Sequence, residues 1–190
     1  MEFGDALRRR RMVRRFTGDP IPSDQANRIA AAASRAPTAG NTQGITVVSV
    51  TDPDRIGLIA EACGEQAYID KGFDRWLSTA AQHIALCVEP GRYRERYSEA
   101  DKDASALETV PWWWVDAGAA LMAILLTAVD EGLAAGFHGG QSADGVGELL
   151  AIPETVELVG IVAVGHPAPD RRSSSLDRPK RDDSVRHDLW

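Results

Sequence analysis

Cysteine is scarce in this 190-residue chain, which contains only Cys63 and Cys87. The two residues are far apart and form none of the paired motifs that bind metals or carry redox chemistry, so we expect two reduced thiols in a core. The four histidines also show no metal-ligand spacing. The sequence therefore predicts neither a disulfide framework nor a metal site.

Uncharged apolar runs and the common nucleotide-binding motifs are also missing. The longest apolar stretch, residues 115–137, contains Asp116, Asp130 and Glu131, which favours a buried helix over a membrane span. There is no GxGxxG motif, no P-loop and no GxSxG elbow. We therefore expect a cytoplasmic protein without a membrane partner, a Rossmann site or a nucleophilic serine.

Positive charge is concentrated in one short segment of an otherwise acidic chain. The formal net charge is -7, yet six arginines fall within residues 8–15. These are Arg8, Arg9, Arg10, Arg11, Arg14 and Arg15. Arginine binds phosphate in planar, bidentate geometry and keeps its charge, so the cluster predicts an anion site. A solvated basic surface remains an equal alternative at this point.

Two other interpretations of this basic segment are disfavoured. A nucleic-acid-binding module usually has a high isoelectric point, whereas this chain has one near 5.1, so we expect no nucleic-acid partner. A secretory signal would continue into an apolar stretch, but residues 16–20 have turn chemistry. Glu2 and Asp5 also argue against a mitochondrial transit peptide.

The length predicts one domain over residues 1–190. Helices are expected over residues 4–11, 23–34, 53–63, 73–82, 112–131 and 142–150. Strands are expected over residues 45–50, 83–88 and 156–164. Residues 136–140 contain three glycines and predict a flexible turn. Residues 90–111 predict an exposed excursion or lid, and residues 170–190 a C-terminal arm that ends in Trp190.

Four segments occur in an order that resembles the nitroreductase family. They are RRMVRRF at residues 10–16, APTAGNTQ at 36–43, DAGAA at 116–120 and GIVAVGHP at 160–167. The resemblance implies an α+β fold, with a mixed β-sheet flanked by helices, and a homodimer. It also implies an FMN cofactor at the dimer interface, in contact with both subunits.

The resemblance also implies roles for individual residues. Arginines of the first segment would hold the FMN phosphate, with Met12 where the family usually has serine. Residues of the second segment would follow the edge of the flavin ring or contact it through polar groups. Backbone of the 136–140 segment would meet the ring, and a basic pair near the end of the chain would return to the phosphate. The implied cofactor-binding residues are Arg10, Arg11, Met12, Arg14, Pro37, Thr38, Ala39, Asn41, Gln43, Phe137, His138, Gly139, Gly140, Lys180 and Arg181.

Several of these assignments have alternatives. His138 is equally consistent with a surface histidine on a turn, and Lys180 and Arg181 with solvated charges in a tail. Trp112, Trp113 and Trp114 are adjacent on a predicted helix, so they cannot all face one ligand, and we expect packing roles for two of them.

The family chemistry is ping-pong hydride transfer from NAD(P)H through FMN to an aromatic acceptor such as a nitroaromatic, a quinone or a flavin. It requires no side chain as nucleophile, so no catalytic acid or base is predicted. One alternative is a flavin-binding or sequestering protein of the same fold with little turnover. Others are relatives that fragment flavin to the lower ligand of cobalamin, remove halogens or use deazaflavin F420.

Overall fold

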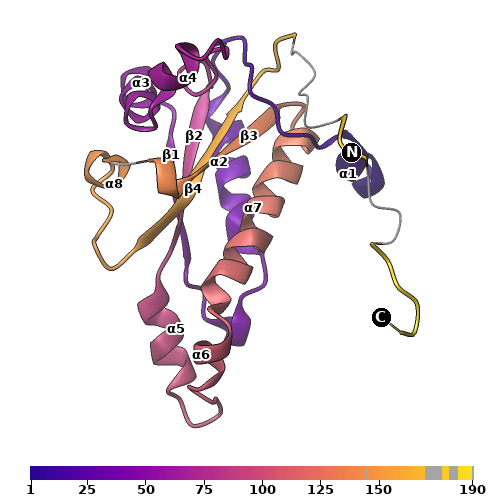
Figure 1. Ribbon diagram of the computed structural model, residues 1–190, viewed down its shortest axis with the longest axis vertical. Coiled ribbons are helices and arrows are strands. Elements are labelled where there is room, and N and C mark those ends of the chain that lie inside the picture. The colour runs from indigo at the N-terminus through magenta and orange to yellow at the C-terminus, as the bar shows by residue number, and fades with distance from the viewer. Residues whose placement is uncertain (144, 170–176, 180–183, 190) are drawn as a thin grey trace.

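The structure is a computed structural model that describes residues 1–143, 145–169, 177–179 and 184–189. Its centre is an antiparallel sheet with the strand order β1-β2-β4-β3 and helices on both faces (Figure 1). The strands are β1 (Ile45–Val50), β2 (Gln82–Val88), β3 (Ala134–Gly139) and β4 (Glu157–Gly165). One isolated parallel bridge joins Met12 to Ala135 at the β3 edge. The predicted α+β class is confirmed.

The helices connect and cover these strands. The α-helices are α1 (Phe3–Arg9), α2 (Ser23–Ala31), α3 (Pro53–Ala62), α4 (Glu65–Ile69), α5 (Pro90–Tyr97), α6 (Ala106–Thr109), α7 (Trp112–Asp130) and α8 (Val146–Leu149). The 3-10 helices are η1 (Ala32–Arg35), η2 (Ala39–Asn41) and η3 (Gly140–Ser142).

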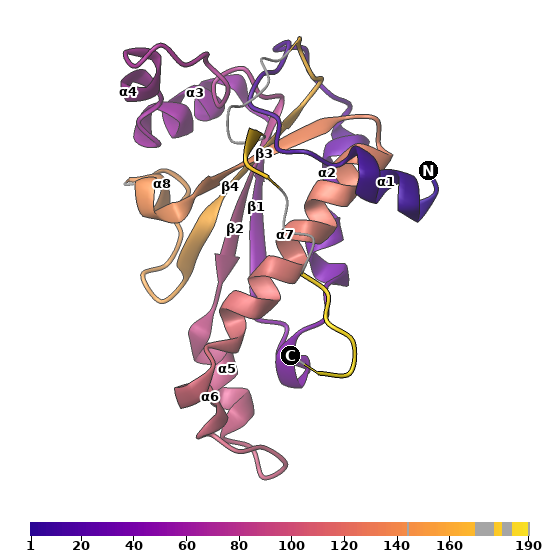
Figure 2. The ribbon, with the colours of Figure 1, turned by 45° about the vertical axis from the view of Figure 1, so that its right-hand side comes forward.

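The two central strands build a core on each face of the sheet. Because side chains alternate across a strand, Ile84 and Leu86 of β2 point to one face and Ala85 and Cys87 to the other. The first face packs against α2 and α7, and the second against α3 and α8, as Figures 1 and 2 show. Both cysteines are buried and unpaired, as predicted, and burial raises the pKa of Cys63 to about 12 and that of Cys87 to about 11.

The longest helix, α7, lies across the sheet within one residue of its predicted bounds. It ends before Gly132, whose φ of 76° breaks the helical path. By length and composition, α7 is the one helix of the described residues that could cross a membrane. However, it buries Asp116 and packs Ala120, Ile124 and Ala128 into the core, which is typical of a core helix.

Three of the four strands, β1, β2 and β4, were predicted to within one residue, but the helix predicted over residues 73–82 is wrong. That segment is irregular, and the helix lies earlier, at α4. The cause is the buried carboxylate of Glu65, which accepts hydrogen bonds from the backbone amides of Trp76 and Leu77 at 2.8 and 2.7 Å. Backbone amides that donate to a side chain in this way are not available for the hydrogen bonds of an α-helix.

The flexible turn predicted over residues 136–140 is also wrong, because these residues form most of strand β3 and the start of η3. Their glycines serve close packing. A Cβ on Gly136 would lie 2.2 Å from the carbonyl oxygen of Val13, and one on Gly160 of β4 would lie 2.3 Å from that of His138. Backbone segments approach each other here at distances that only glycine permits.

The excursion predicted over residues 90–111 consists of two helices, α5 and α6, which extend beyond one end of the sheet (Figures 1 and 2). It is anchored by Tyr93, which is fully buried. Part of the predicted C-terminal arm lies outside the described residues. Lys180, Arg181 and Trp190 are among the residues that are not described.

Candidate functional site

The arginine segment follows the free edge of β3 as extended chain. The amide of Val13 donates to the carbonyl of Ala135 at 2.9 Å, and Met12 forms the parallel bridge to the same residue. Further along, Phe16 pairs with Pro167 beyond the end of β4. Because Val13 and Phe16 are buried, the intervening Arg14 points outward. The sheet edge therefore fixes the backbone from which the predicted phosphate-binding arginines project.

The Arg14 guanidinium connects this segment to an aromatic cluster beside the end of β3. It lies 5.6 Å from the centroid of the Trp76 ring, within the range of a cation–π contact. The Trp76 ring lies 6.2 Å from that of His138, and the Tyr68 ring lies 6.4 Å from His138 on another side. The structure thus brings the arginine segment together with the predicted 137–140 segment.

His138 is a buried member of this cluster. Only 6% of it is exposed, and its Nε2 lies 3.0 Å from the carbonyl oxygen of Ser142. The interpretation of His138 as a surface histidine is therefore wrong. Its neighbour Phe137 is half-buried on the opposite face of the sheet, against the α2 and α7 side of the core.

The predicted ring-edge residues form a tight turn around η2. Gly40, Asn41 and Gln43 have φ values of 62°, 53° and 54°, all in the left-handed region. The Thr38 hydroxyl accepts a hydrogen bond from the Gln43 amide at 3.0 Å, and the Thr42 hydroxyl donates to the Ala39 carbonyl at 2.6 Å. The turn therefore has a defined shape even though two of its left-handed residues are not glycine.

A buried carboxylate ties this turn to α7. Asp116 accepts hydrogen bonds from the Ala39 amide at 2.8 Å and from the Tyr93 hydroxyl at 2.7 Å, both on Oδ2. Burial and the neighbouring Asp116 raise the pKa of Tyr93 well above its ordinary value. The sequence marked Asp116 as part of a family motif but gave no partner for it. An acidic residue in so apolar a helix signals a buried hydrogen-bond acceptor.

Sequence reasoning missed Trp76, Tyr93 and Arg96. No local pattern distinguishes these residues, because each acts through a contact with a segment distant in the chain. Of the three adjacent tryptophans, Trp113 packs near the Tyr93 ring at 6.0 Å, whereas Trp114 is 44% exposed. No cluster of metal-ligating side chains is found in the part of the chain that the structure describes.

The two groups of predicted site residues lie at opposite ends of α7. The Ala39 turn binds Asp116 near the start of the helix, while the Met1 amino group pairs with Asp130 at its end, at 2.6 Å. These acidic residues are separated by about 21 Å at 1.5 Å per residue. The turn and the N-terminus that precedes the arginine segment therefore contact opposite ends of α7.

The chain matches one known protein family and is similar to several named relatives. Residues 7–166 match the Nitroreductase family. The chain is 30% identical over 159 residues to the NADPH-flavin oxidoreductase of Vibrio harveyi, covering 83% of this chain and 62% of that protein. It is 29% identical over 184 residues to an FMN reductase (NAD(P)H) of Bacillus subtilis strain 168, covering 93% and 69%. The chain thus spans less than two thirds of the Vibrio protein.

A solved structure extends this similarity to the fold. The NADPH:FMN oxidoreductase from Vibrio harveyi, complexed with NAD+, superposes with a TM-score of 0.67 at 24% identity. The match covers 99% of this chain and 79% of that one.

Proposed function

Because this chain belongs to the nitroreductase family, we propose that it is an FMN-dependent oxidoreductase that passes a hydride from NAD(P)H to a small aromatic acceptor such as a nitroaromatic, a quinone or a flavin. The observation that carries the proposal is the pairing of the arginine segment with β3. This pairing fixes Arg14 beside Trp76 and the glycine-bearing end of the strand.

The residues of the chain fit the chemistry of FMN. The phosphate requires permanent positive charge, which Arg10, Arg11 and Arg14 supply from one extended segment. Met12 presents no hydroxyl, but its backbone lies in the bridge to β3, so the segment keeps its path without a serine at that position. The polar side chains of the 37–43 turn suit the polar ribityl chain of FMN, and the rigid backbone of the turn suits the flat flavin ring.

The protein groups bind and orient, and the redox chemistry belongs to the cofactor. When bound, FMN supplies a ring that accepts and donates hydride. Arg10, Arg11 and Arg14 would hold the phosphate end. Pro37, Thr38 and Ala39 would lie along the ring edge, and Asn41 and Gln43 would offer polar groups to it. Phe137, His138 and Gly139 of β3, with Gly140 that follows, would meet the ring, and Lys180 and Arg181 would add positive charge at the phosphate.

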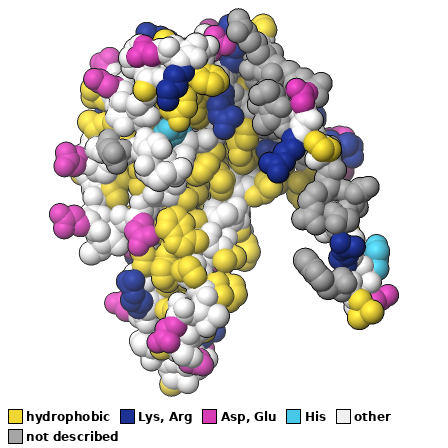
Figure 3. All heavy atoms as spheres, viewed as in Figure 1, with side chains coloured by type: hydrophobic (Ala, Val, Ile, Leu, Met, Phe, Trp, Pro, Cys, Tyr) yellow, Lys and Arg dark blue, Asp and Glu magenta, His cyan; other side chains and the backbone are white. Residues whose placement is uncertain are grey.

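We propose that a homodimer completes the site. In one chain, the turn contacts the start of α7 and the segment that leads into the arginines contacts its end. A second copy related by two-fold symmetry would supply the missing group. The surface of α7 suits this pairing. Val115, Gly118 and Met122 line one exposed stripe of the helix, and Figure 3 has hydrophobic side chains gathered over this part of the molecule.

We infer that residues 1–190 act as one domain in the cytoplasm. On this proposal, residues 90–111 border the acceptor side of the site, and residues 170–190 form an arm that reaches the partner subunit. Two unpaired, buried cysteines agree with a reducing compartment.

The absorbance spectrum of the purified protein, followed by anaerobic addition of NADPH or NADH, tests the function. We expect a yellow protein that bleaches with one of the two donors and recovers its colour with a quinone or a nitroaromatic. A yellow protein that neither donor reduces would favour flavin sequestration instead. A colourless protein that cannot be loaded with FMN would refute the proposal.

A further inference from the structure

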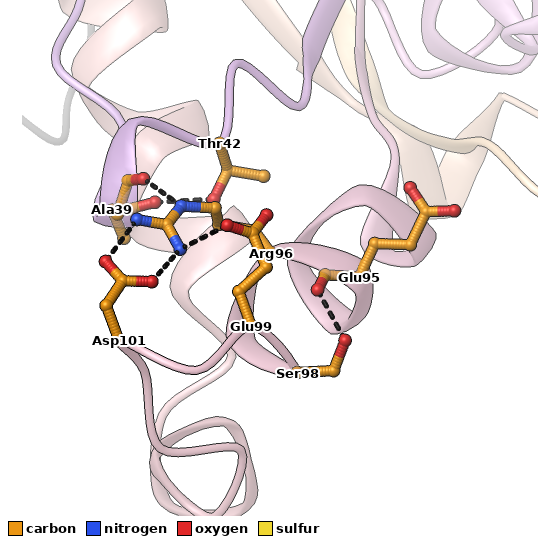
Figure 4. Close-up of polar contacts among 8 residues, drawn as sticks. Ala39, Thr42, Glu95, Arg96, Ser98, Glu99 and Asp101 are labelled. Atoms are coloured by element: carbon orange, nitrogen blue, oxygen red, sulfur yellow. Dashed lines mark hydrogen bonds and ion pairs between the residues drawn. The ribbon is translucent and has the colours of Figure 1, made fainter.

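The 38–43 turn is held from outside by the helical excursion that follows β2. Arg96 of α5 donates from Nε to the Gly40 carbonyl oxygen at 2.9 Å, across a separation of 56 residues in the chain (Figure 4). This carbonyl belongs to the first of the three left-handed residues of the turn. Arg96 therefore restrains the turn at the start of its left-handed backbone.

The other donors of Arg96 are committed to acidic residues of the same excursion. Nη1 and Nη2 contact the two carboxylate oxygens of Asp101 at 2.8 Å each, and Nη1 also contacts Glu99 at 3.0 Å. Figure 4 shows the guanidinium enclosed between these carboxylates and the backbone of the turn. These partners hold the guanidinium in a single orientation and occupy its nitrogen atoms. Arg96 therefore supports the turn and is not positioned to bind a ligand itself.

Packing reinforces this hydrogen bond. A Cβ on Gly40 would lie 3.3 Å from Lys102 and 3.3 Å from the Tyr97 ring, and one on Gly44 would lie 2.3 Å from the Tyr93 ring. Together with the Asp116 carboxylate, which holds the Ala39 amide, these contacts enclose the turn from two helices. The excursion is thus closed onto the turn by specific contacts, unlike a mobile lid.

We propose that Arg96, oriented by Asp101, is a positioning residue that keeps the 38–43 turn in the conformation that binds the flavin. The inference rests on the proposed function, since that function assigns the turn to the ring edge. It adds a specific role for α5 and α6, which is to preform one wall of the site. Binding then does not have to order three left-handed residues.

The test compares Arg96→Ala, Asp101→Asn and a matched control, Arg92→Ala, in the full-length protein. Arg92 lies on the same helix and pairs with Glu89, but it has no contact with the turn among the described residues. FMN affinity is measured by titrating flavin-free protein and following flavin fluorescence. Amide hydrogen exchange of residues 39–43 is measured in the same flavin-free samples, and thermal melting checks the fold.

We expect Arg96→Ala to weaken FMN binding about tenfold, as for the loss of one charge-assisted contact. The amides of the turn should exchange faster, while the melting temperature stays close to that of the unmodified protein. Asp101→Asn should show a smaller change of the same kind, and Arg92→Ala no change. Unchanged affinity and exchange in Arg96→Ala, or an equal loss in Arg92→Ala, would overturn the inference. Failure of the unmodified protein to bind FMN would instead overturn the proposed function, and this role of Arg96 with it.

Discussion

At the scale of single residues, Arg14 differs from its neighbours in what its guanidinium contacts. Arg8 pairs with Asp5, and Arg15 lies 3.7 Å from Asp74. Arg14 has no carboxylate partner within the described part of the chain and lies over the Trp76 ring instead. An aromatic face positions a guanidinium without neutralising its charge, so Arg14 stays available to an anion.

Replacing Arg14 or Arg10 with alanine should therefore weaken FMN binding and leave the fold intact. On the proposed function, each change would remove a charge-assisted phosphate contact, roughly 1.5–3 kcal/mol of binding free energy. Fluorescence titration with FMN measures the loss, and Arg8→Ala, an exposed change in α1, is the matched control. Unchanged affinity in both the Arg14 and the Arg10 variants would refute the assignment of this segment to the phosphate.

Glu65 is a second residue of interest, because its surroundings shift the pKa of its carboxyl. Burial by itself raises the pKa of its carboxyl, but the hydrogen bonds from residues 76–78 outweigh burial and hold the pKa below its ordinary value of 4.5. A carboxyl with a lowered pKa in the folded state stabilises the fold above its unfolded pKa. This stabilisation is lost as the pH falls below 4.5 through the folded pKa.

Glu65→Gln should accordingly lower the free energy of unfolding by roughly 1–2 kcal/mol at pH 7 and flatten its dependence on pH below 4.5. Urea denaturation at several pH values measures both effects. The matched change Glu61→Gln, at an exposed position of α3, should have neither. If the two variants had the same pH profile, the hydrogen bonds to residues 76–78 would not be the cause.

At the scale of elements, the sequence predicted what depends on local pattern and failed where distant contacts decide. β1, β2, β4 and α7 follow from continuous or alternating apolar residues. The 73–82 segment fails because Glu65, eleven residues before Trp76, takes its amides. β3 fails because three glycines suggest a turn in sequence, whereas here they allow the arginine segment and β4 to approach its backbone.

The same limit applies to the candidate site. Arg10, Arg14 and the 37–43 turn were found from composition and motif. Arg96 was not, because nothing in the local sequence of α5 indicates that its guanidinium reaches Gly40. Residues that bind a ligand leave a pattern of residue types, whereas residues that position a binding segment are recognised only by their contacts.

Gly136 of β3 affects both the fold and the proposed site, because the arginine segment packs closely against its backbone. In Gly136→Ala, the new methyl group would lie 2.2 Å from the Val13 carbonyl, so the arginine segment would have to move away from the strand. We expect a loss of thermal stability and weaker FMN binding together. Gly57→Ala, at an exposed position of α3 where a Cβ meets nothing within 4 Å, should instead be neutral or slightly stabilising. A fully stable Gly136→Ala variant with normal affinity would contradict this linkage.

At the scale of the whole molecule, the position of α7 supports the proposed dimer. The turn contacts the start of the helix and the N-terminus contacts its end, and an apolar stripe is exposed over residues 115–122. A second copy packed on that stripe would give each site one group of residues from each protomer. This arrangement differs from a dimer of two self-contained sites, and complementation between variants distinguishes the two.

We therefore predict that two inactive variants restore FMN binding when they are co-expressed. One variant carries Arg10→Ala and Arg14→Ala, and the other carries Thr38→Arg, which blocks the turn. In a mixed dimer, one site receives both altered groups and the other receives neither. Purification through two different affinity tags selects the mixed dimers, and about half of their sites should be intact because each mixed dimer has one good site. The flavin content of the purified mixed dimers measures this. Mixed dimers without flavin would mean that each chain builds its own site.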